Sequence, residues 1–252
     1  MKNTIDILNR EFSRQNYSDE QACNSDMAEI KGVASNYARI ENAIAVLSDL
    51  RADMSYICYG GFANIFGLGK DVKEGTFESI WEKDIFSRIH PDDLDRKHAQ
   101  ELCFFHFIKQ QPRQKRRDYY LMSKLRMRTT TNSYIPVMHR MFYIFGKSGE
   151  TLRMALCLYS PLIADFQAGC LIIDSSDGHI IETEKQDNDS ILSAREKQIL
   201  GLIDKGMTSK DIAEMLYISI NTVSRHRQDI LSKLQVKNSI EACRIAKELK
   251  II

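Results

Sequence analysis

The chain has 252 residues, of which 43% are hydrophobic and 27% charged, and its formal net charge is +1. This length accommodates two domains, and the composition is that of an ordinary globular protein. No stretch approaches the roughly 18 to 20 consecutive apolar residues of a spanning helix, and the N-terminus MKNTIDILNREFSRQ lacks the apolar core of a signal peptide. We therefore expect a cytoplasmic protein without a membrane partner.

The spacing of the cysteines gives no sign of a metal site. They show no CxxC pair and no short Cys/His ligand spacing, so we expect reduced, mostly buried thiols and no cysteine-based metal site. The six positions are Cys23, Cys58, Cys103, Cys157, Cys170 and Cys243.

The first 50 residues are expected to be helical. Ile5, Leu8 and Phe12 are spaced as one face of a helix, and a second apolar stripe follows at steps of three to four residues. That stripe comprises Ile30, Val33, Tyr37, Ile40, Ile44 and Leu47. We assign residues 1–42 to an N-terminal helical segment that packs on the next domain or on a second subunit.

From Met54 the pattern changes to that of strands. Residues 55–59, 119–127, 134–145 and 151–159 are rich in aromatic, branched and other apolar residues. The polar turns TTTNS and GKSGE join the last three, which predicts an antiparallel meander. Apolar and polar residues alternate along it, so we expect one face to pack and the other to be partly wet.

A helical stretch lies between the first of these strands and the meander. The sequence HPDD at 90–93 predicts a helix start, because Pro91 fits the first helical position and Asp92 and Asp93 favour the positive end of the helix dipole. An early strand, intervening helices and three meandering strands, with YGGFANIFG at 59–67, resemble a PAS domain. The resemblance implies a module that senses a signal in a pocket or mediates dimerisation.

No cofactor is evident for this PAS-like domain. The Asn-Cys-Arg context of a flavin adduct is missing, and His98 and His106, which share a predicted helix with Cys103, are expected to pack or face solvent rather than to bind haem or a metal. The run RQKRR at 113–117 is expected to be a solvated loop.

The end of this domain is also predicted from sequence. Two apolar runs around a Ser/Asp/Gly turn at 169–182 predict an extra hairpin. We therefore assign 43–182 to the PAS-like sensor domain, 183–190 to a charged linker, and 191–252 to a further domain.

Residues 191–252 carry 11 Lys/Arg and 7 Asp/Glu, whereas residues 1–190 carry 24 and 27. Four helix-start signals punctuate this basic segment, each a capping residue followed three positions later by a polar partner. They are Ser193 with Glu196, Thr208 with Asp211, Ser219 with Thr222, and Asn238 with Glu241. Gly206 supplies a left-handed position at the end of the first helix. We therefore predict four short helices.

The third of these helices has two different faces. Val223, Ile230 and Leu234 form its inward row, with Ile220 and Leu231 at the margins. Its far side is polar and carries Asn221, Ser224, Arg225, Gln228 and Ser232. Two short helices joined by a tight turn, the second with a polar outer face, match a helix-turn-helix whose second helix lies in the major groove.

The segment resembles the LuxR-type (GerE-like) helix-turn-helix. The matching residues are Leu192, Ser193, Arg195, Glu196, Gly206, Ile212, Ala213, Leu216, Ser219, Thr222, Val223, His226, Ile230, Lys233, Leu234 and Ala242. The segment that contains them covers about a quarter of the chain.

The residue types and this resemblance together give each position an expected role. Arg, Gln and Asn can bond base edges, which nominates Asn221, Ser224, Arg225 and Gln228 as base readers. Backbone phosphates are assigned to Thr208, Ser209, Lys210, Thr222, His226 and Lys233. The resemblance further implies a dimer through the fourth helix, for which we nominate Ile240, Cys243 and Lys247.

Two departures from the family leave the target sequence open. The family's basic position two after Thr222 is Ser224 here, and the basic group has moved to Arg225. Arg227 falls near the inward row, where its stem could cover the core while its guanidinium reaches outward. Asp229, four residues after Arg225, could pair with it and restrain or mask it.

We predict an α+β chain in which a PAS-like antiparallel sheet with helices precedes an all-α four-helix domain. The predicted function is that of a homodimeric, sequence-specific transcription regulator that binds double-stranded DNA in response to a small-molecule or protein signal. One alternative is an acyl-homoserine-lactone-like receptor, which the presence of Trp81 as the single tryptophan disfavours. Another is a hydrolase using Cys103 with His106, which no nucleophile elbow supports. We therefore expect no enzymatic activity.

Overall fold

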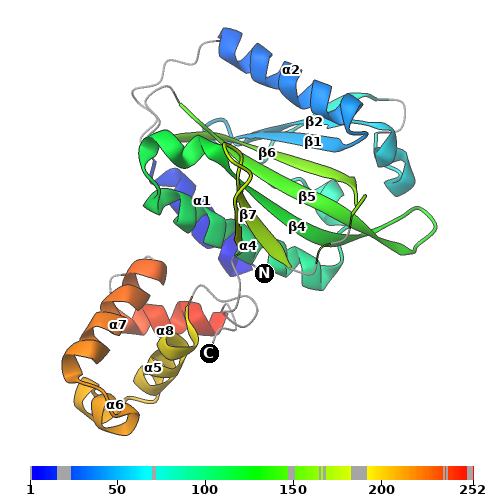
Figure 1. Cartoon of the computed structure of the whole chain (residues 1–252). Coiled ribbons are helices and arrows are strands. Elements are labelled where there is room, and N and C mark those ends of the chain that lie inside the picture. The colour runs from blue at the N-terminus through cyan, green and yellow to red at the C-terminus, as the bar shows by residue number, and fades with distance from the viewer. Residues whose placement is uncertain are drawn as a thin grey trace. The chain divides into compact units, whose positions relative to one another are not determined.

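The computed structural model describes residues 2–15, 24–69, 72–146, 151–164, 166, 169–182, 192–234, 236, 238–248 and 252. By its contacts the chain divides into two compact units, Leu8–Thr183 and Glu184–Ile252 together with Met1–Ile7. We call them the sheet unit and the C-terminal unit (Figure 1). The predicted linker at 183–190 lies outside the described residues. None of the described helices combines the length and apolar character needed to cross a bilayer.

The sheet unit is built on one eight-stranded sheet in which every pairing is antiparallel. The spatial order of its strands is β3-β2-β1-β6-β5-β4-β7-β8. The strands are β1 (Ile44–Asp49), β2 (Met54–Tyr59), β3 (Glu74–Phe77), β4 (Tyr119–Arg128), β5 (Tyr134–Phe145), β6 (Leu152–Pro161), β7 (Cys170–Asp174) and β8 (Ile180–Glu182). The consecutive pairing of β4, β5 and β6 confirms the predicted meander, and β7 with β8 confirms the predicted hairpin.

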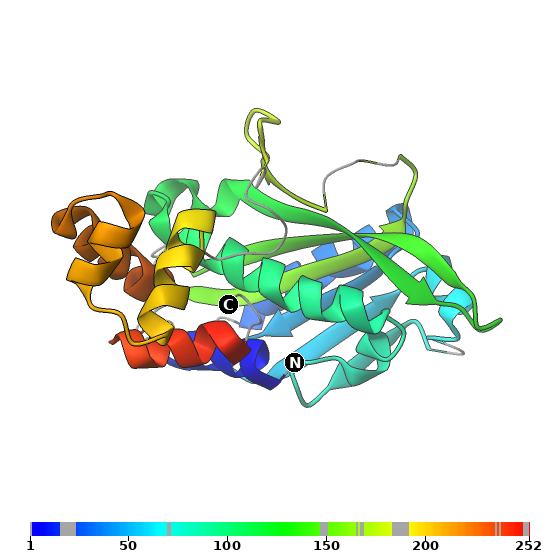
Figure 2. The same ribbon diagram turned by 90° about the horizontal axis from the view of Figure 1, so that it is seen from below.

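Helices cover both faces of this sheet. They are α1 (Lys2–Ser13), α2 (Asn24–Ile40), α3 (Lys83–Phe86) and α4 (Pro91–Gln110), with 3-10 turns η1 (Gly61–Phe66) and η2 (Arg113–Asp118). Helix α2 lies on one face, and α4 lies on the other together with residues 8–13 of α1 (Figures 1 and 2). Phe12 of α1 meets Phe105 of α4 edge to face at 5.5 Å between ring centroids, so these two helices form one layer.

The face under α2 is an apolar core. Leu47, Leu156 and Leu158 are at most 4% exposed there, and small residues of α2, Ala34 and Ala38, let the helix approach closely. Burial of such side chains, at about 25 cal/mol per Å² of apolar surface, is the main force that holds α2 on the sheet.

The predicted helix start at HPDD is confirmed, and Asp93 does more than favour the dipole. The His90 side chain accepts the amide N–H of Asp92 as the cap of α4, which begins at Pro91. Asp93 is 1% exposed and accepts hydrogen bonds from the backbone N–H and guanidinium of Arg126 at 2.7 to 2.8 Å. This arrangement fastens the start of α4 to β4.

The helical prediction for residues 44–49 is wrong, because these residues form β1. All six are buried, since β1 lies between β2 and β6 with helices over both faces. A strand buried on both faces has a continuous apolar sequence, and Ile40, Ile44 and Leu47 happen to fall at helical spacing. Asn42, at φ 52°, marks the turn between α2 and this strand.

Two smaller expectations also need correction. The partly wet face predicted for the meander holds for β4 but not for β6, where Tyr159 is fully buried because helices cover both faces of the sheet at this central strand. The run at 113–117 is part of the 3-10 turn η2 rather than a loop, although none of its residues is buried.

The C-terminal unit contains the four predicted helices. They are α5 (Ala194–Asp204), α6 (Ser209–Leu216), α7 (Ile220–Leu234) and α8 (Ser239–Glu248). An early strand pair, intervening helices and a three-stranded meander, followed by this helical domain, confirm the predicted fold class. The N-terminal sheet is PAS-like in this arrangement.

Candidate nucleic-acid interface

Side chains close the N-termini of the first two helices of the C-terminal unit. The Ser193 hydroxyl accepts the amide N–H of Glu196 at 3.2 Å, and the Glu196 carboxylate accepts the N–H of Ser193 at 2.7 Å. Thr208 and Asp211 form the same reciprocal pair at the start of α6. Both predicted capping boxes are therefore confirmed, and each satisfies amide groups that the first helical turn leaves without a partner.

The last two helices begin at the predicted residues as well. The Ser219 hydroxyl accepts the N–H of Thr222 at 3.0 Å, and the Asn238 side chain accepts the N–H of Glu241 at 2.9 Å. Helix α6 ends at Leu216, and the residue that caps it, Tyr217, is in the left-handed region at φ 52°. This left-handed residue turns the chain sharply, so that α7 starts only four residues after α6 ends.

Helix α7 has the two faces predicted for it. Val223, Ile230 and Leu234 are at most 3% exposed and form the core with α5 and α6. The four predicted base readers are all exposed on the surface of the helix: Asn221, Ser224, Arg225 and Gln228. This face offers hydrogen-bonding groups of different lengths that no core contact consumes.

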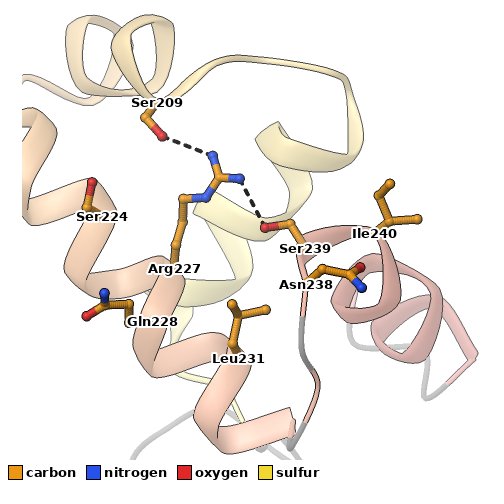
Figure 3. Close-up of a pocket in the computed structure, with 8 residues that line it drawn as sticks. All are labelled: Ser209, Ser224, Arg227, Gln228, Leu231, Asn238, Ser239 and Ile240. Atoms are coloured by element: carbon orange, nitrogen blue, oxygen red, sulfur yellow. Dashed lines mark hydrogen bonds between the residues drawn. The ribbon is translucent and has the colours of Figure 1, made fainter.

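A hollow of about 440 Å³ opens beside this polar face (Figure 3). Its lining consists of Ser209, Ser224, Arg227, Gln228, Leu231, Asn238, Ser239 and Ile240. The guanidinium of Arg227 crosses it, donating to the hydroxyl of Ser209 at 2.9 Å and to that of Ser239 at 3.0 Å. Since Ser209 and Ser239 are the first residues of α6 and α8, Arg227 ties two helix N-termini to α7.

Arg225 is not engaged by the residue that was expected to restrain it. Among the described side chains no ion pair joins Arg225 to Asp229, and Asp229 instead lies near Glu196 and His226. Arg225 therefore extends from α7 as an exposed cation, which is the form that bonds a guanine edge or a phosphate.

The predicted phosphate-binding residues fall into two groups. Thr208, Ser209 and Lys210 surround the start of α6, where backbone N–H groups and the helix dipole favour an anion. Thr222 and His226 follow along α7; Thr222 is exposed and shares a hydrogen bond with Ser219, while Nδ1 of His226 is buried without a partner. These assignments remain predictions.

Lys233, the sixth predicted phosphate ligand, is held by a carboxylate of its own domain. Its ammonium donates to both oxygens of Glu196 at 2.7 and 2.8 Å. Burial opposes ionisation of Glu196, but the hydrogen bonds from Lys233 and Ser193 outweigh it and hold the pKa of Glu196 below its ordinary value. A phosphate would have to compete with this ion pair, so Lys233 has first of all a structural role.

The three residues nominated for a dimer interface differ in their environment. Ile240 is 85% exposed at the start of α8, and Lys247 is exposed and paired with Asp204 at 2.7 Å. Cys243 is only 8% exposed, and its thiol donates to the Leu200 carbonyl at 3.9 Å inside the domain. Of the three, only Ile240 and Lys247 offer a surface to a partner.

The comparison with known families agrees with this geometry. Residues 190–246 match the bacterial regulatory proteins of the luxR family, whose domain is named GerE. Residues 190–246 form a LuxR-type helix-turn-helix domain. The buried row, the four caps and the exposed face of α7 all lie within the matched residues of this LuxR-type domain.

Relatives match only part of the chain. The oxygen regulatory protein NreC of Staphylococcus haemolyticus is 40% identical over 74 residues, which are 29% of this chain and 34% of that protein. NreC of Staphylococcus epidermidis is 45% identical over 62 residues, or 25% and 28% of the two chains. The chain thus spans about a third of the length of the relatives that it matches.

Solved structures match a larger share of the chain, but at lower sequence identity. A phage VqmA–DPO complex shares 17% identity over 88% of each chain, with a TM-score of 0.32. A PAS domain from Colwellia psychrerythraea shares 14% identity over 53% of this chain and 94% of its own, with a TM-score of 0.33. TM-scores this low do not establish a common arrangement, so the assignment of the LuxR-type domain stands on its sequence and its own geometry.

The sequence predicted the exposed polar face of α7 but gave no indication of the contacts that Arg227 makes. Its position near the inward row indicated a stem over the core and an outward guanidinium. The hydroxyls that receive that guanidinium are 18 and 12 residues away in the chain, at the ends of other helices. Ser209 and Ser239 directly follow the predicted capping residues Thr208 and Asn238, but their convergence on Arg227 is a property of the folded domain.

Proposed function

We propose that this chain is a sequence-specific DNA-binding transcription regulator whose helix α7 lies in the major groove. The observation that carries the proposal is the exposed face of α7 on a LuxR-type domain, which is rich in hydrogen-bonding side chains. In this arrangement Asn221, Ser224, Arg225 and Gln228 meet base edges, and the short Ser224 lets the helix approach closely.

Phosphates on either side of the groove fix the orientation of α7. The start of α6, with Thr208, Ser209 and Lys210, faces one strand, and Thr222 with His226 contacts the backbone beside the recognition residues. Arg227 supports this arrangement without reading bases, because it holds the N-termini of α6 and α8 against α7. Positioning of this kind sets the register in which the bases are read.

The proposal extends to the whole molecule as follows. The chain acts in the cytoplasm as a homodimer through α8, with the exposed Ile240 as an apolar contact, and binds two half-sites about one helical turn apart. The PAS-like sheet unit receives a small-molecule or protein signal, or strengthens the dimer, and so changes how the two recognition helices are presented. In this proposal the chain carries out no chemical reaction.

The test begins with selection of binding sites from a random duplex library by the full-length protein, followed by titrations over a range of salt concentrations. Arg225→Ala should weaken binding to the selected site by about 1–3 kcal/mol, or roughly 5- to 150-fold, and relax the preference at one base position. Lys210→Ala should weaken selected and random DNA alike and lower the salt slope by about one.

Lys197→Ala is the matched control, because it removes one positive charge from α5 rather than from the recognition helix. Its effect on both DNA classes should be small. If the full-length protein enriched no sequence, or if Lys197→Ala and Arg225→Ala reduced selective binding equally, the proposed role of α7 would be refuted.

A further inference from the structure

The face of the sheet opposite α2 holds a buried cluster of polar side chains that the proposed function does not use. One ring nitrogen of His139, the thiol sulfur of Cys157 and a carboxylate oxygen of Glu101 lie within 4.8 Å of one another. His139 is fully buried, and Glu101 and Cys157 are 6% and 9% exposed. We propose that these three side chains form a binding site for a divalent cation of the zinc class.

Strand register explains why the first two ligands meet. In the pairing of β5 with β6, His139 faces Tyr159 and Met141 faces Cys157. Residues two apart on a strand point to the same face, so His139 and Cys157 are diagonal neighbours on one face. Glu101 reaches the same place from α4, which covers that face (Figure 2).

The hydrogen bonding of His139 leaves one ring nitrogen available to a metal. Nδ1 lies 3.1 Å from the hydroxyl of Ser123, its cross-strand neighbour on β4, whereas Nε2 is buried with no hydrogen-bond partner. With the proton on Nδ1 and donated to Ser123, Nε2 carries the lone pair that a metal requires. A second bond of this kind typically orients a metal-binding histidine. Metal binding also explains why Nε2 of His139 is buried without a hydrogen-bond partner, an arrangement that would otherwise only destabilise the fold.

The carboxylate is oriented in a comparable way. The ammonium of Lys97 donates to Oε1 of Glu101 at 2.5 Å, which leaves Oε2 to coordinate a cation. Lys97 thus acts as a positioning residue for the ligand Glu101.

The charges of the site balance when a cation binds. Coordination converts the Cys157 thiol to a thiolate and releases one proton to solvent, so cation and thiolate together add one positive charge to the neutral pair of Lys97 and Glu101. Glu82 is also buried and accepts hydrogen bonds from the hydroxyls of Ser48 and Ser55. Burial raises the pKa of Glu82, so the charge balance requires that its carboxyl group ionise when the cation binds. The cluster therefore accepts the ion without leaving an uncompensated charge in the interior.

The donor set selects the kind of ion. Sulfur, imidazole nitrogen and one carboxylate oxygen suit Zn²⁺, whereas Mg²⁺ and Ca²⁺ require oxygen ligands throughout. Three protein ligands leave a fourth position for water or a small ligand. The C-terminal cluster of Glu196, His226 and Asp229 offers no sulfur, and its Glu196 is already bound by Lys233 and Ser193.

The experiment measures metal on the full-length protein without DNA, so that its failure and failure of the proposed function are distinguishable. The protein is incubated with Zn²⁺, freed of excess ion and analysed for bound zinc, and a Co²⁺-loaded sample is examined for the thiolate-to-cobalt charge-transfer band. We expect close to one zinc per chain and a distinct band. Cys157→Ser should remove the band and lower retained zinc at least tenfold.

Cys58→Ser is the matched control, because Cys58 is an equally buried thiol on the opposite face of the same sheet, under α2. It should keep both the zinc and the band. Fluorescence of Trp81 reports whether each variant keeps the fold of the sheet unit.

As a measurement that needs no variant, zinc X-ray absorption of the wild-type protein should show one sulfur at about 2.3 Å with nitrogen and oxygen neighbours. Absence of retained zinc, a metal shell without sulfur, or a band that survives Cys157→Ser would overturn the proposal.

Discussion

The inner face of the sheet and the outer face of α7 both carry polar side chains, but under opposite conditions. Lys97, Glu101 and His139 are nearly inaccessible to water, whereas Asn221 and Arg225 are exposed. A polar group in the interior costs free energy unless it is paired, while one at the surface costs almost nothing. Buried polar groups therefore indicate a site through their partners, and exposed ones through the ligand that they can reach.

The two units also differ in how they are assembled. Each helix of the LuxR-type domain starts at a capping residue whose side chain accepts the N–H of the residue three positions later. Most of the sequence signals for these helices are therefore local. The sheet unit joins β1 to β6, whose partners Ile44 and Tyr159 are far apart in the chain. Local signals can be read from sequence, and distant pairings cannot.

The largest expected effect comes from breaking the buried ion pair. Lys97→Met leaves the Glu101 carboxylate buried without its cation and should destabilise the sheet unit by about 3–5 kcal/mol in chelator-treated protein. Urea unfolding followed by fluorescence measures this directly, because the single tryptophan, Trp81, lies in the sheet unit.

The double variant Lys97→Met with Glu101→Gln should recover much of that loss, because it removes the uncompensated charge. Amide exchange in α5 to α8 should stay unchanged. A single variant as stable as the wild type would show that the interior of the sheet is not the costly environment described above.

Acid should weaken the sheet unit through its buried histidines. Burial, with a contribution from Lys97, lowers the pKa of His98 from 6.5 to about 3, and burial also lowers the pKa of His106 and His139. Below pH 6.5 these histidines bind protons in the unfolded chain but remain neutral in the folded chain. Their contribution to the free energy of unfolding is therefore complete above pH 6.5 and is lost as the pH falls towards 3. One such histidine contributes about 1.4 kcal/mol per pH unit.

The control replaces the ring by one that cannot be protonated. His98 packs edge to face against Trp81 and Phe86, and its nitrogens have no partner, so His98→Phe fits the chemistry of that site. Urea unfolding between pH 6.5 and 4.5 should show a shallower dependence in His98→Phe than in the wild type. Equal slopes would mean that the proton on His98 does not contribute.

The smallest effect tests the local construction of the LuxR-type domain. Ser193→Ala removes the hydroxyl that caps α5 and should cost about 1 kcal/mol. Faster amide exchange at the start of α5, with no change in Trp81 fluorescence, measures it. Ser224→Ala also removes a serine hydroxyl, but from an exposed position in the middle of α7, where alanine is favoured. This substitution should be neutral or slightly stabilising. A larger loss in Ser224→Ala than in Ser193→Ala would contradict the assigned cap.

Much of the candidate interface could be predicted from the sequence because helix caps and periodicity act within a few residues. The starts of α5 to α8 and the inward row of Val223, Ile230 and Leu234 were predicted in this way, and so was the polar face of α7. The sequence could not show that Lys233 is bound by Glu196, or that Cys243 is enclosed in the domain. Both depend on which helix packs against which.

The sequence by itself determined two things: a LuxR-type domain with an exposed polar helix, and an antiparallel meander preceded by helices. Only the tertiary structure decided that residues 44–49 form a central strand, because burial on both faces erases the alternation that identifies a strand. Tertiary structure alone also brought Glu101, His139 and Cys157 together, since their proximity follows from strand register and helix packing rather than from spacing. Short-range order is encoded in neighbouring residues, whereas a site inside a sheet exists only once distant strands have paired.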